Sequence, residues 1–227
     1  MTEHSVSQHL RIEIRDYDET IRRFIPGYDR MIQTAVDEVA RLAPMLVVDL
    51  GAGTGALAER LLATTEATDV ELLDVDPAMM AAAQARLARF EDRARFRLGS
   101  FHDPLPRVGA MMASLSLHHI REPEAKAAFF RRIADALEPG GVFVNADITI
   151  PASGPDHDRL YRFWADHLVA AGIAEGRAWE HFAEWSGEDR YFPAEDELGW
   201  LATAGLEAEE VWRFGPASVI AAWKPGR

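Results

Sequence analysis

The chain has 227 residues, of which 48% are hydrophobic and 27% charged, a balance that predicts a folded domain and excludes disordered, collagen-like and coiled-coil proteins. It contains no cysteine, which excludes disulfide scaffolds, thiolate zinc sites and cysteine nucleophiles. Its net charge of −13 disfavours nucleic acids and anionic membranes as partners, and its apolar runs are far shorter than the roughly 18 residues of a membrane helix.

The N-terminal part, residues 1–44, is predicted to be a helical lid or substrate-binding segment in front of a main domain at 45–227. Residues 1–19 lack the positively charged and then apolar pattern of a secretory signal, so we expect a cytoplasmic protein. Residues 17–28 carry a tyrosine at each end and include Phe24-Ile-Pro-Gly27, which predicts a helix followed by a break.

In the middle of the chain, short aliphatic runs alternate with amphipathic stretches, a pattern typical of a parallel sheet with helices on both faces. The predicted strands lie at 45–50, 70–75, 94–98, 110–117 and 142–150. One intervening helix is expected to begin at Asp76-Pro77, where aspartate can cap the helix and proline suits its first turn. Another is expected over 123–137 and to end at Pro139-Gly-Gly141, where glycine permits a left-handed cap.

The composition changes at 151–155, and we expect a cap insertion at about 151–193. Within it, apolar side chains recur at helical spacing, at Leu160, Phe163, Trp164, His167 and Leu168. A helix near 195–204 and two strands at 206–214 and 217–223 follow, and the two strands predict an antiparallel hairpin at one edge of the sheet.

The strongest signal is Val47-Val-Asp-Leu-Gly-Ala-Gly-Thr-Gly55, in which a strand runs into a glycine turn. Such a turn lets the backbone approach a ligand, and the next helix offers free amides. The spacing Gly51-x-Gly53-x-x-Ala56 also satisfies the dinucleotide fingerprint. However, Asp49 places a carboxylate beside the turn, which suits a ligand with an amine better than a pyrophosphate. Asp74 ends the second strand, where a carboxylate can accept both hydroxyls of a ribose.

Four motifs in this order resemble the class I S-adenosylmethionine-dependent methyltransferases of the small-molecule type. They are Asp49-Leu-Gly-Ala-Gly-Thr-Gly55, Asp74-Val-Asp-Pro-Ala-Met79, Ser114-Leu-Ser-Leu-His-His119 and Leu137-Glu-Pro-Gly-Gly141. The resemblance, which covers about 47–150, implies an α/β fold with a Rossmann-like, doubly wound seven-stranded sheet. The expected strand order is 3-2-1-4-5-7-6, with the last strand antiparallel. It also implies S-adenosylmethionine as the cofactor, converted to S-adenosylhomocysteine.

The resemblance further implies roles for the matching residues. The backbone of Gly51, Ala52 and Gly53 would lie against the methionine part of the cofactor. Asp49 would orient its ammonium group, and Asp74 would hold the ribose hydroxyls. Val75 and Met79 would pack near the adenine, and Ser116 would border the methionine chain. Ser100 replaces the acidic residue that the family often has beside the adenine amine, so we expect Phe101 or a backbone group to contribute more there.

His118 and His119 follow the fourth strand and are the first candidates for a general base, which is needed if the acceptor loses a proton. We expect His118 to face the pocket and His119 to anchor the loop, although two structural histidines are an open alternative. Asn145 and Asp147 end the fifth strand, where metal-dependent catechol methyltransferases place ligands. The sequence shows no second acidic partner for them, so we predict no metal.

Residues 17–28 also resemble the lead-in of many small-molecule methyltransferases, in which a tyrosine-bearing helix closes over the cofactor. Tyr17, Arg23 and Tyr28 are therefore candidates for lid or substrate contacts, as are Trp164 and His167 further along. The structural alternative, that these residues are simply core and helix ends, stays open.

The leading hypothesis is transfer of a methyl group to an O, N or C atom of a small-molecule substrate. Ile25-Pro-Gly-Tyr28 also resembles the enzyme that makes carboxy-S-adenosylmethionine from prephenate, but its carboxylate-binding arginine cannot be assigned here. A nicotinamide-dependent reductase of the short-chain type needs Tyr-x-x-x-Lys, and no tyrosine meets this requirement. A non-catalytic cofactor-binding protein is a third alternative. We expect no nucleic-acid or membrane partner and leave open a homodimer.

Overall fold

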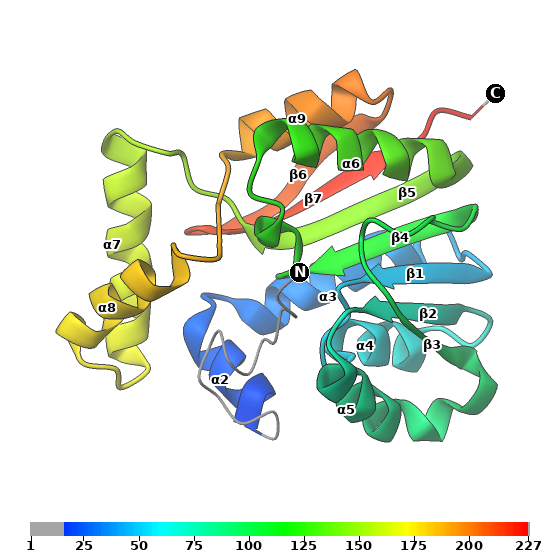
Figure 1. The fold of residues 1–227 in the computed structure, drawn as a ribbon, viewed down its shortest axis with the longest axis horizontal. Coiled ribbons are helices and arrows are strands. Elements are labelled where there is room, and N and C mark those ends of the chain that lie inside the picture. The colour runs from blue at the N-terminus through cyan, green and yellow to red at the C-terminus, as the bar shows by residue number, and fades with distance from the viewer. Residues whose placement is uncertain (1–15, 227) are drawn as a thin grey trace.

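The computed structural model describes residues 16–226, and within them the strands form one seven-stranded sheet of order β3-β2-β1-β4-β5-β7-β6 (Figure 1). Strands β1 to β5 are parallel, and β7 runs antiparallel to both β5 and β6. The strands are β1 Leu46–Leu50, β2 Asp69–Asp74, β3 Ala94–Leu98, β4 Val108–Ser114, β5 Leu137–Ile148, β6 Glu207–Phe214 and β7 Ala217–Trp223. The predicted sheet order and closing hairpin are confirmed.

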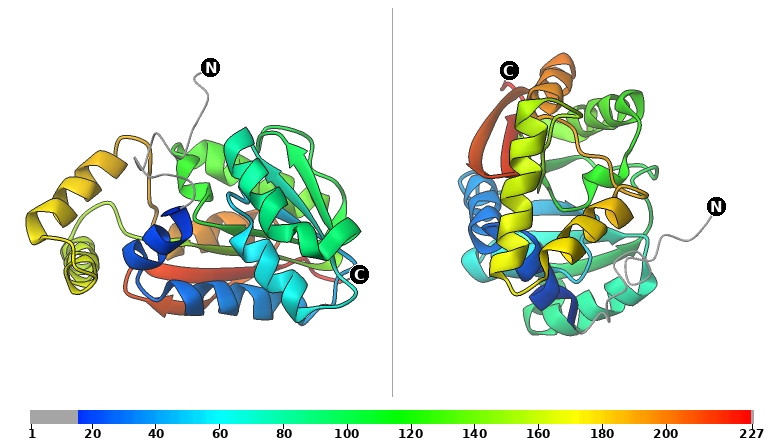
Figure 2. Two further views of the ribbon diagram at one scale, coloured as in Figure 1. Left: turned by 90° about the horizontal axis from the view of Figure 1, so that it is seen from below. Right: turned by 90° about the vertical axis from the view of Figure 1, so that its left-hand side faces the viewer.

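Helices cover both faces of the sheet. They are α2 Tyr17–Phe24, α3 Tyr28–Ala40, α4 Ala56–Thr64, α5 Pro77–Leu87, α6 Pro123–Ala136, α7 Pro155–Ala170, α8 Glu175–Trp185 and α9 Ala194–Thr203, with short 3-10 turns η2 Ala88–Arg93 and η3 Leu117–His119. Helices α3 and α4 lie on one face, and α6 and α9 on the other (Figure 2). As predicted, the side chain of Asp76 caps α5 by accepting from the backbone amides of the helix's first turn.

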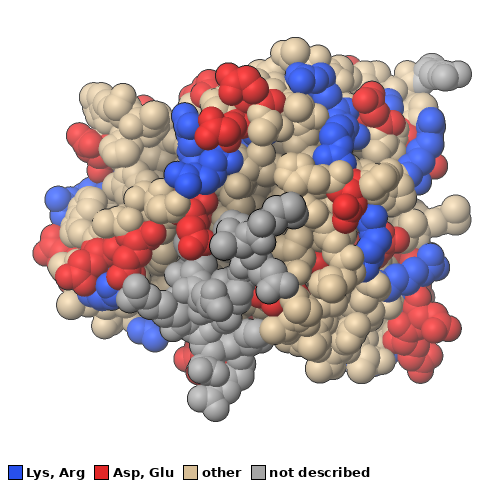
Figure 3. All heavy atoms as spheres, viewed as in Figure 1, with Lys and Arg blue, Asp and Glu red and all other residues tan. Residues whose placement is uncertain are grey.

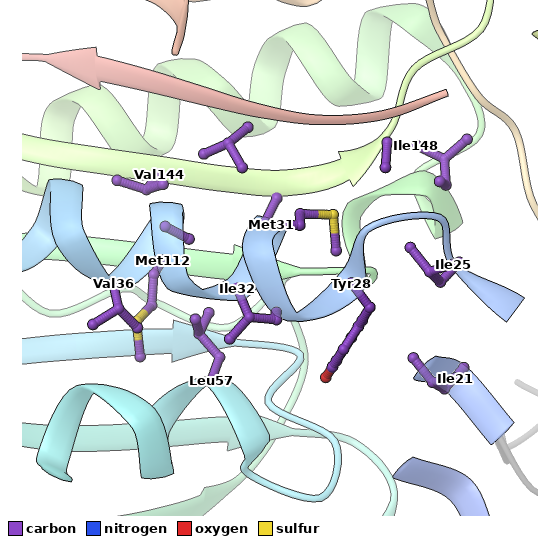
Figure 4. Close-up of a cluster of buried hydrophobic side chains, with 14 of the residues drawn as sticks. Ile21, Ile25, Tyr28, Met31, Ile32, Val36, Leu57, Met112, Val144 and Ile148 are labelled. Carbon is purple, nitrogen blue, oxygen red and sulfur yellow. The ribbon is translucent and has the colours of Figure 1, made fainter. Parts of the chain in front are cut away.

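Each face of the sheet has its own buried core because side chains alternate along a strand. Met112 of β4 and Val144 of β5 face Met31 and Ile32 of α3, as Figure 4 shows. Their strand neighbours point the other way, so that Met111 packs with the α6 side. Strands β1, β4 and β5 are buried almost throughout, which is why they read as continuous aliphatic runs.

Two predicted boundaries are wrong. Strand β4 ends at Ser114 instead of residue 117, because Leu115 adopts a positive φ of 49° and the chain turns into η3. Helix α6 ends at Ala136, where Leu137 is already extended and pairs with Val108. The glycines after it therefore belong to β5 and do not cap the helix.

The helices beyond the sheet lie near the carboxyl ends of the parallel strands, where α7 and α8 stand at the left of Figure 1. Helix α2 lies at the same end, whereas α3 packs along the sheet. The proposed division at residue 44 and the cap at 151–193 stay predictions, and residues 1–15 of the N-terminal segment lie outside the described residues.

The surface is charged with both signs. On the face shown in Figure 3, acidic and basic side chains are interspersed. No helix within residues 16–226 is long and apolar enough to cross a membrane.

A buried ion pair joins α6 to α9. The Nζ atom of Lys126 lies 2.6 Å from Oε1 of Glu197, and both side chains are only 1% exposed. The amide of Asn145 on β5 donates to the other oxygen of Glu197 at 3.0 Å. These contacts fix the α9 helix on the sheet, because each buried charge requires its partner.

We expect Lys126→Met to lower the free energy of unfolding by about 3–5 kcal/mol, because Glu197 would be left as an unpaired buried charge. Lys126→Met combined with Glu197→Gln should recover most of this loss, since glutamine can still accept from Asn145. Urea denaturation measures both effects. As a control, Arg159→Met removes an exposed pair with Asp156 and should cost less than about 1 kcal/mol. A single variant as stable as the wild type would contradict the expectation.

Candidate active site

A cavity of about 970 Å³ opens at the carboxyl ends of the central strands. Its wall combines the turns after β1, β2, β3 and β4 with residues from α2, α7 and α8. Strand order reverses between β1 and β4, and open parallel sheets bind ligands at such a switch point. The position of the cavity therefore favours it as the ligand-binding site.

The glycine turn after β1 forms one end of this cavity. Gly51 has a φ of +67°, and a Cβ atom added to it would lie 2.5 Å from Cβ of Ser116, so no other residue fits without a shift. Gly53 has a φ of +54°, and an added Cβ atom there would meet nothing within 4 Å. The turn thus packs tightly against the β4 turn on one side and leaves backbone open to the cavity on the other.

Asp74 stands beside this turn with its carboxylate at the cavity wall. Its Oδ2 accepts from the amide of Gly53 at 2.7 Å, and its Oδ1 accepts from the amide of Asp76 at 2.8 Å. Burial raises the pKa of Asp74, and these backbone hydrogen bonds only partly oppose it. A carboxylate has about four lone-pair sites, so Asp74 can accept further bonds from a diol. Val75, Ser100 and Phe101 line the same end of the cavity.

Asp49 is buried next to the glycine turn and is not among the described residues that line the cavity. It lies on β1 on the same face as Val47. Burial, followed by the nearby charge of Asp74, raises the pKa of Asp49 to about 8. The expected contact of Asp49 with a ligand's ammonium group stays a prediction.

His118 lies on η3 directly after β4 and is held by Asp147 at the end of β5. Its Nδ1 lies 2.7 Å from Oδ1 of Asp147, and its backbone amide donates to Oδ2 at 3.2 Å. Because a carboxylate only accepts hydrogen bonds, Nδ1 carries a proton and Nε2 is the nitrogen that can gain or lose one. His118 also lines the cavity, so this pair has the geometry of an oriented general base.

The charges around His118 set its pKa. Burial alone would lower the pKa of His118, but the charges of Asp147 and Asp189 and the hydrogen bond that His118 donates to Asp147 outweigh burial and raise it to about 8. Burial would raise the pKa of Asp147, yet His118 and Lys126 lower it, so Asp147 stays ionised. His118 must therefore lose a proton before it can act as a base at neutral pH.

A second polar group faces His118 from the loop after α8. Oδ1 of Asp189 lies 3.7 Å from Nε2 of His118 and 3.2 Å from Nδ1 of His119, and the hydroxyl of Tyr191 donates to Oδ2 at 2.9 Å. The amide of Arg190 donates to the carbonyl of His118, which ties this loop to η3. One ligand atom from each of His118, His119 and Asp189 can come within 4.8 Å of the others, so this group could also hold a metal ion.

Aromatic side chains form the rest of the wall. They are Tyr17, Phe24 and Tyr28 from the N-terminal helices, Trp164 and Trp185 from α7 and α8, and Tyr191. The indole Nε1 of Trp164 donates to the carbonyl of Phe24 at 2.6 Å, and this bond joins α7 to α2. Asp18 of α2 accepts from Thr54 of the glycine turn at 2.7 Å and pairs with Arg86. Helix α2 is thereby fixed over the cavity.

Known proteins resemble this chain over the same region. A family model described as a methyltransferase domain matches residues 47–141, which include the glycine turn, Asp74 and His118. The crystal structure of human N-acetylserotonin methyltransferase in complex with SAM is similar with a TM-score of 0.62 and 21% identity, covering 86% of this chain and 51% of that chain. Residues 47–141 thus match a methyltransferase domain, and the chain has the fold of this S-adenosylmethionine-dependent methyltransferase.

Two curated relatives of this chain differ from each other in activity. One is the carboxy-S-adenosyl-L-methionine synthase of Aeromonas hydrophila, 26% identical over 70% of this chain and 66% of the relative. The other is the trans-aconitate 2-methyltransferase of Methylobacterium nodulans, 29% identical over 84% of this chain and 69% of the relative. The chain thus spans about two thirds of these relatives and about half of the human protein.

Most of the predicted site residues meet at the cavity. The lining includes Tyr17, Tyr28, Gly51, Ala52, Gly53, Asp74, Val75, Ser100, Phe101, Ser116, His118, His119 and Trp164. Besides Asp49, three predicted residues do not line it. Met79 is completely buried in α5, Arg23 donates to the carbonyl of Ala171, and His167 lies on α7 with burial lowering its pKa.

Sequence reasoning missed the side chains that the loop after α8 contributes to the cavity. Asp189 and Tyr191 follow no periodic pattern, and only the fold brings them beside His118. Trp185 belongs to an aromatic-rich stretch of the sequence, but such a stretch predicts a buried core as well as it predicts a ligand-binding wall. Asp147 was considered only as a metal ligand, whereas it holds His118.

Proposed function

We propose that this protein binds S-adenosylmethionine and transfers its methyl group to a hydroxyl oxygen of a small, largely apolar molecule, with His118 as the general base. The observation that carries the proposal is the 2.7 Å contact between His118 and buried Asp147, which leaves Nε2 for the acceptor. Histidine held in this way suits removal of a hydroxyl proton. Methylation of a nitrogen or carbon atom belongs to the same reaction class but has less need of the general base formed by His118 and Asp147.

The residues at the glycine turn fit the cofactor. Gly53 offers open backbone, and Asp74 has acceptor capacity for the ribose hydroxyls. Val75 and Phe101 offer apolar contact for a base at the same end. When bound, S-adenosylmethionine supplies a methyl group whose bond to a positively charged sulfur breaks as the acceptor oxygen bonds to the carbon.

The chain's own groups then have two tasks. His118 takes the hydroxyl proton at Nε2, and Asp147 stabilises the imidazolium that results. Phe24, Trp164 and Trp185 exclude water and align the acceptor, and such alignment lowers the barrier without further chemistry. His119 shares the wall but contacts Asp189, so we assign it to the acceptor end and not to proton removal.

Calorimetric titration with S-adenosylhomocysteine, S-adenosylmethionine and NADPH tests the cofactor. We expect affinities of roughly micromolar order for the two sulfur nucleosides and no binding of NADPH. Mass spectrometry of reactions with hydroxylated acceptors then tests transfer, with a methylated product and S-adenosylhomocysteine expected together. Binding of NADPH alone would overturn the proposal in favour of a reductase, and binding without turnover would favour a non-catalytic protein.

A synthase of carboxy-S-adenosylmethionine is the second candidate, because a relative of that name covers 70% of this chain. That product needs a cation for its new carboxylate. Among residues 16–226, Arg121 is the arginine that lines the cavity, although its NH1 already donates to the carbonyl of Gly187. In the same mass-spectrometric experiment with prephenate, the cofactor itself would gain mass. A cytoplasmic location, a homodimer and the lack of a metal stay predictions.

A further inference from the structure

We propose that the acceptor carries a second hydrogen-bond donor next to the hydroxyl that is methylated, and that Asp189 selects acceptors by binding this donor. The inference rests on the proposed function, because it places the reacting hydroxyl at Nε2 of His118. It adds the chemical class of the acceptor, a ring with two adjacent donors such as an ortho-dihydroxy arene or an ortho-aminophenol.

The geometry that carries the proposal is a pair of hydrogen-bond acceptors that lie side by side in the cavity wall when His118 is in its neutral form. Oδ1 of Asp189 and Nε2 of His118 lie 3.7 Å apart, and their side chains are 5% and 10% exposed. A hydroxyl reaches either atom at about 2.7–2.9 Å, so donors on neighbouring ring atoms can reach both at once. A substrate with a single hydroxyl can donate a hydrogen bond to only one of these two protein atoms.

Two contacts within residues 16–226 hold the carboxylate of Asp189 in place. Tyr191 donates to Oδ2 at 2.9 Å, and His119 lies 3.2 Å from Oδ1. A carboxylate has about four lone-pair sites, so a ligand can join these partners without displacing them. The contact with Tyr191 also fixes the carboxylate in one orientation, which sharpens its preference.

The remaining wall defines the rest of the acceptor. Phe24, Trp164 and Trp185 line the same part of the cavity. The ring centroid of Trp185 lies 5.5 Å from that of Trp164 and 5.2 Å from that of Phe24. Such faces suit a flat ring. The charge of Asp189 disfavours a carboxylate on that ring near the reacting hydroxyl. We therefore expect an uncharged or cationic aromatic acceptor instead of a polycarboxylate.

Initial rates of methylation of catechol, phenol and 2,3-dihydroxybenzoate test this. We expect kcat/KM for catechol to exceed that for each of the others by at least about tenfold. Asp189→Asn should lower the ratio of the catechol value to the phenol value by about tenfold to a hundredfold, because a changed pKa of His118 affects both substrates alike. Asp166→Asn is the matched control, because this exposed aspartate on α7 lies away from the cavity and should change neither value.

Binding of the same three compounds to the protein loaded with S-adenosylhomocysteine gives a readout that does not need turnover. A preference for catechol that Asp189→Asn removes supports the inference even if methyl transfer fails, which would count against the proposed function alone. Equal affinities for catechol and phenol, or equal losses for both in the variant, would overturn the inference. So would a catechol preference abolished by EDTA, because a metal held by His118, His119 and Asp189 would then bind the two hydroxyls.

Discussion

Replacing His118 by glutamine is expected to lower kcat by about a hundredfold to ten-thousandfold, because the variant lacks a group that can take the hydroxyl proton. Binding of S-adenosylhomocysteine should stay within about threefold of the wild type, since His118 lies at the acceptor end of the cavity. Steady-state rates and calorimetry measure the two quantities. His157→Gln is the matched control, because His157 lies on α7 and contacts the carbonyl of Pro151. An unchanged kcat in His118→Gln would remove the general base from the proposal.

The pH profile gives the same histidine a second test. The pKa of His118 is raised to about 8, so its basic, neutral form increases as the pH rises through that value. We therefore expect kcat/KM of the wild type to rise with pH and level off above about 8. Asp147→Asn removes a charge that raises this pKa, so the rise should move to lower pH. Its plateau should also be lower, because asparagine does not hold Nδ1 as a carboxylate does. A profile that is flat between pH 6 and 9 in the wild type would contradict this assignment.

Asp74→Asn is expected to raise the Kd for S-adenosylhomocysteine by at least about a hundredfold. The change removes a charged acceptor that would bind two ribose hydroxyls, and each such bond contributes about 1.5–3 kcal/mol. It also replaces a carboxylate that accepts from the amides of Gly53 and Asp76, so the glycine turn loses part of its support.

Calorimetric titration measures this effect against Asp69→Asn as the control. Asp69 begins the same strand, β2, and forms an exposed pair with Arg95, so its replacement should leave the Kd within about twofold. A change below about tenfold in Asp74→Asn would mean that the ribose is held elsewhere.

The central part of the fold was predictable because its signals are local. A parallel strand buried on both faces must be aliphatic, and a glycine turn with φ values that other residues avoid must contain glycine. Asp76-Pro77 fixes the start of α5 through its own hydrogen bonds. The errors came where a conformation is set by contacts distant in sequence, as at Leu115, whose amide donates to the carbonyl of Ala146 on β5.

The candidate site was predictable to the same extent. The glycine turn, Asp74 and the histidines lie at strand ends, which the sheet order brings to one edge. Asp49 and Met79 share these motifs, but their side chains are completely buried, and a motif alone does not report burial. Asp189 reaches His118 from a loop about 70 residues further along the chain, and no spacing rule predicts such a contact.

Helix α2 contacts both halves of the cavity. Asp18 holds it to Thr54 of the glycine turn, and the carbonyl of Phe24 holds it to Trp164 of α7. Burial raises the pKa of Tyr17, and the charges of Asp74 and Asp189 raise it further. A compound that changes the position of α2 at one end therefore changes the affinity at the other end. Thermodynamic linkage makes this effect reciprocal, so cofactor and acceptor should each change the other's affinity by the same factor.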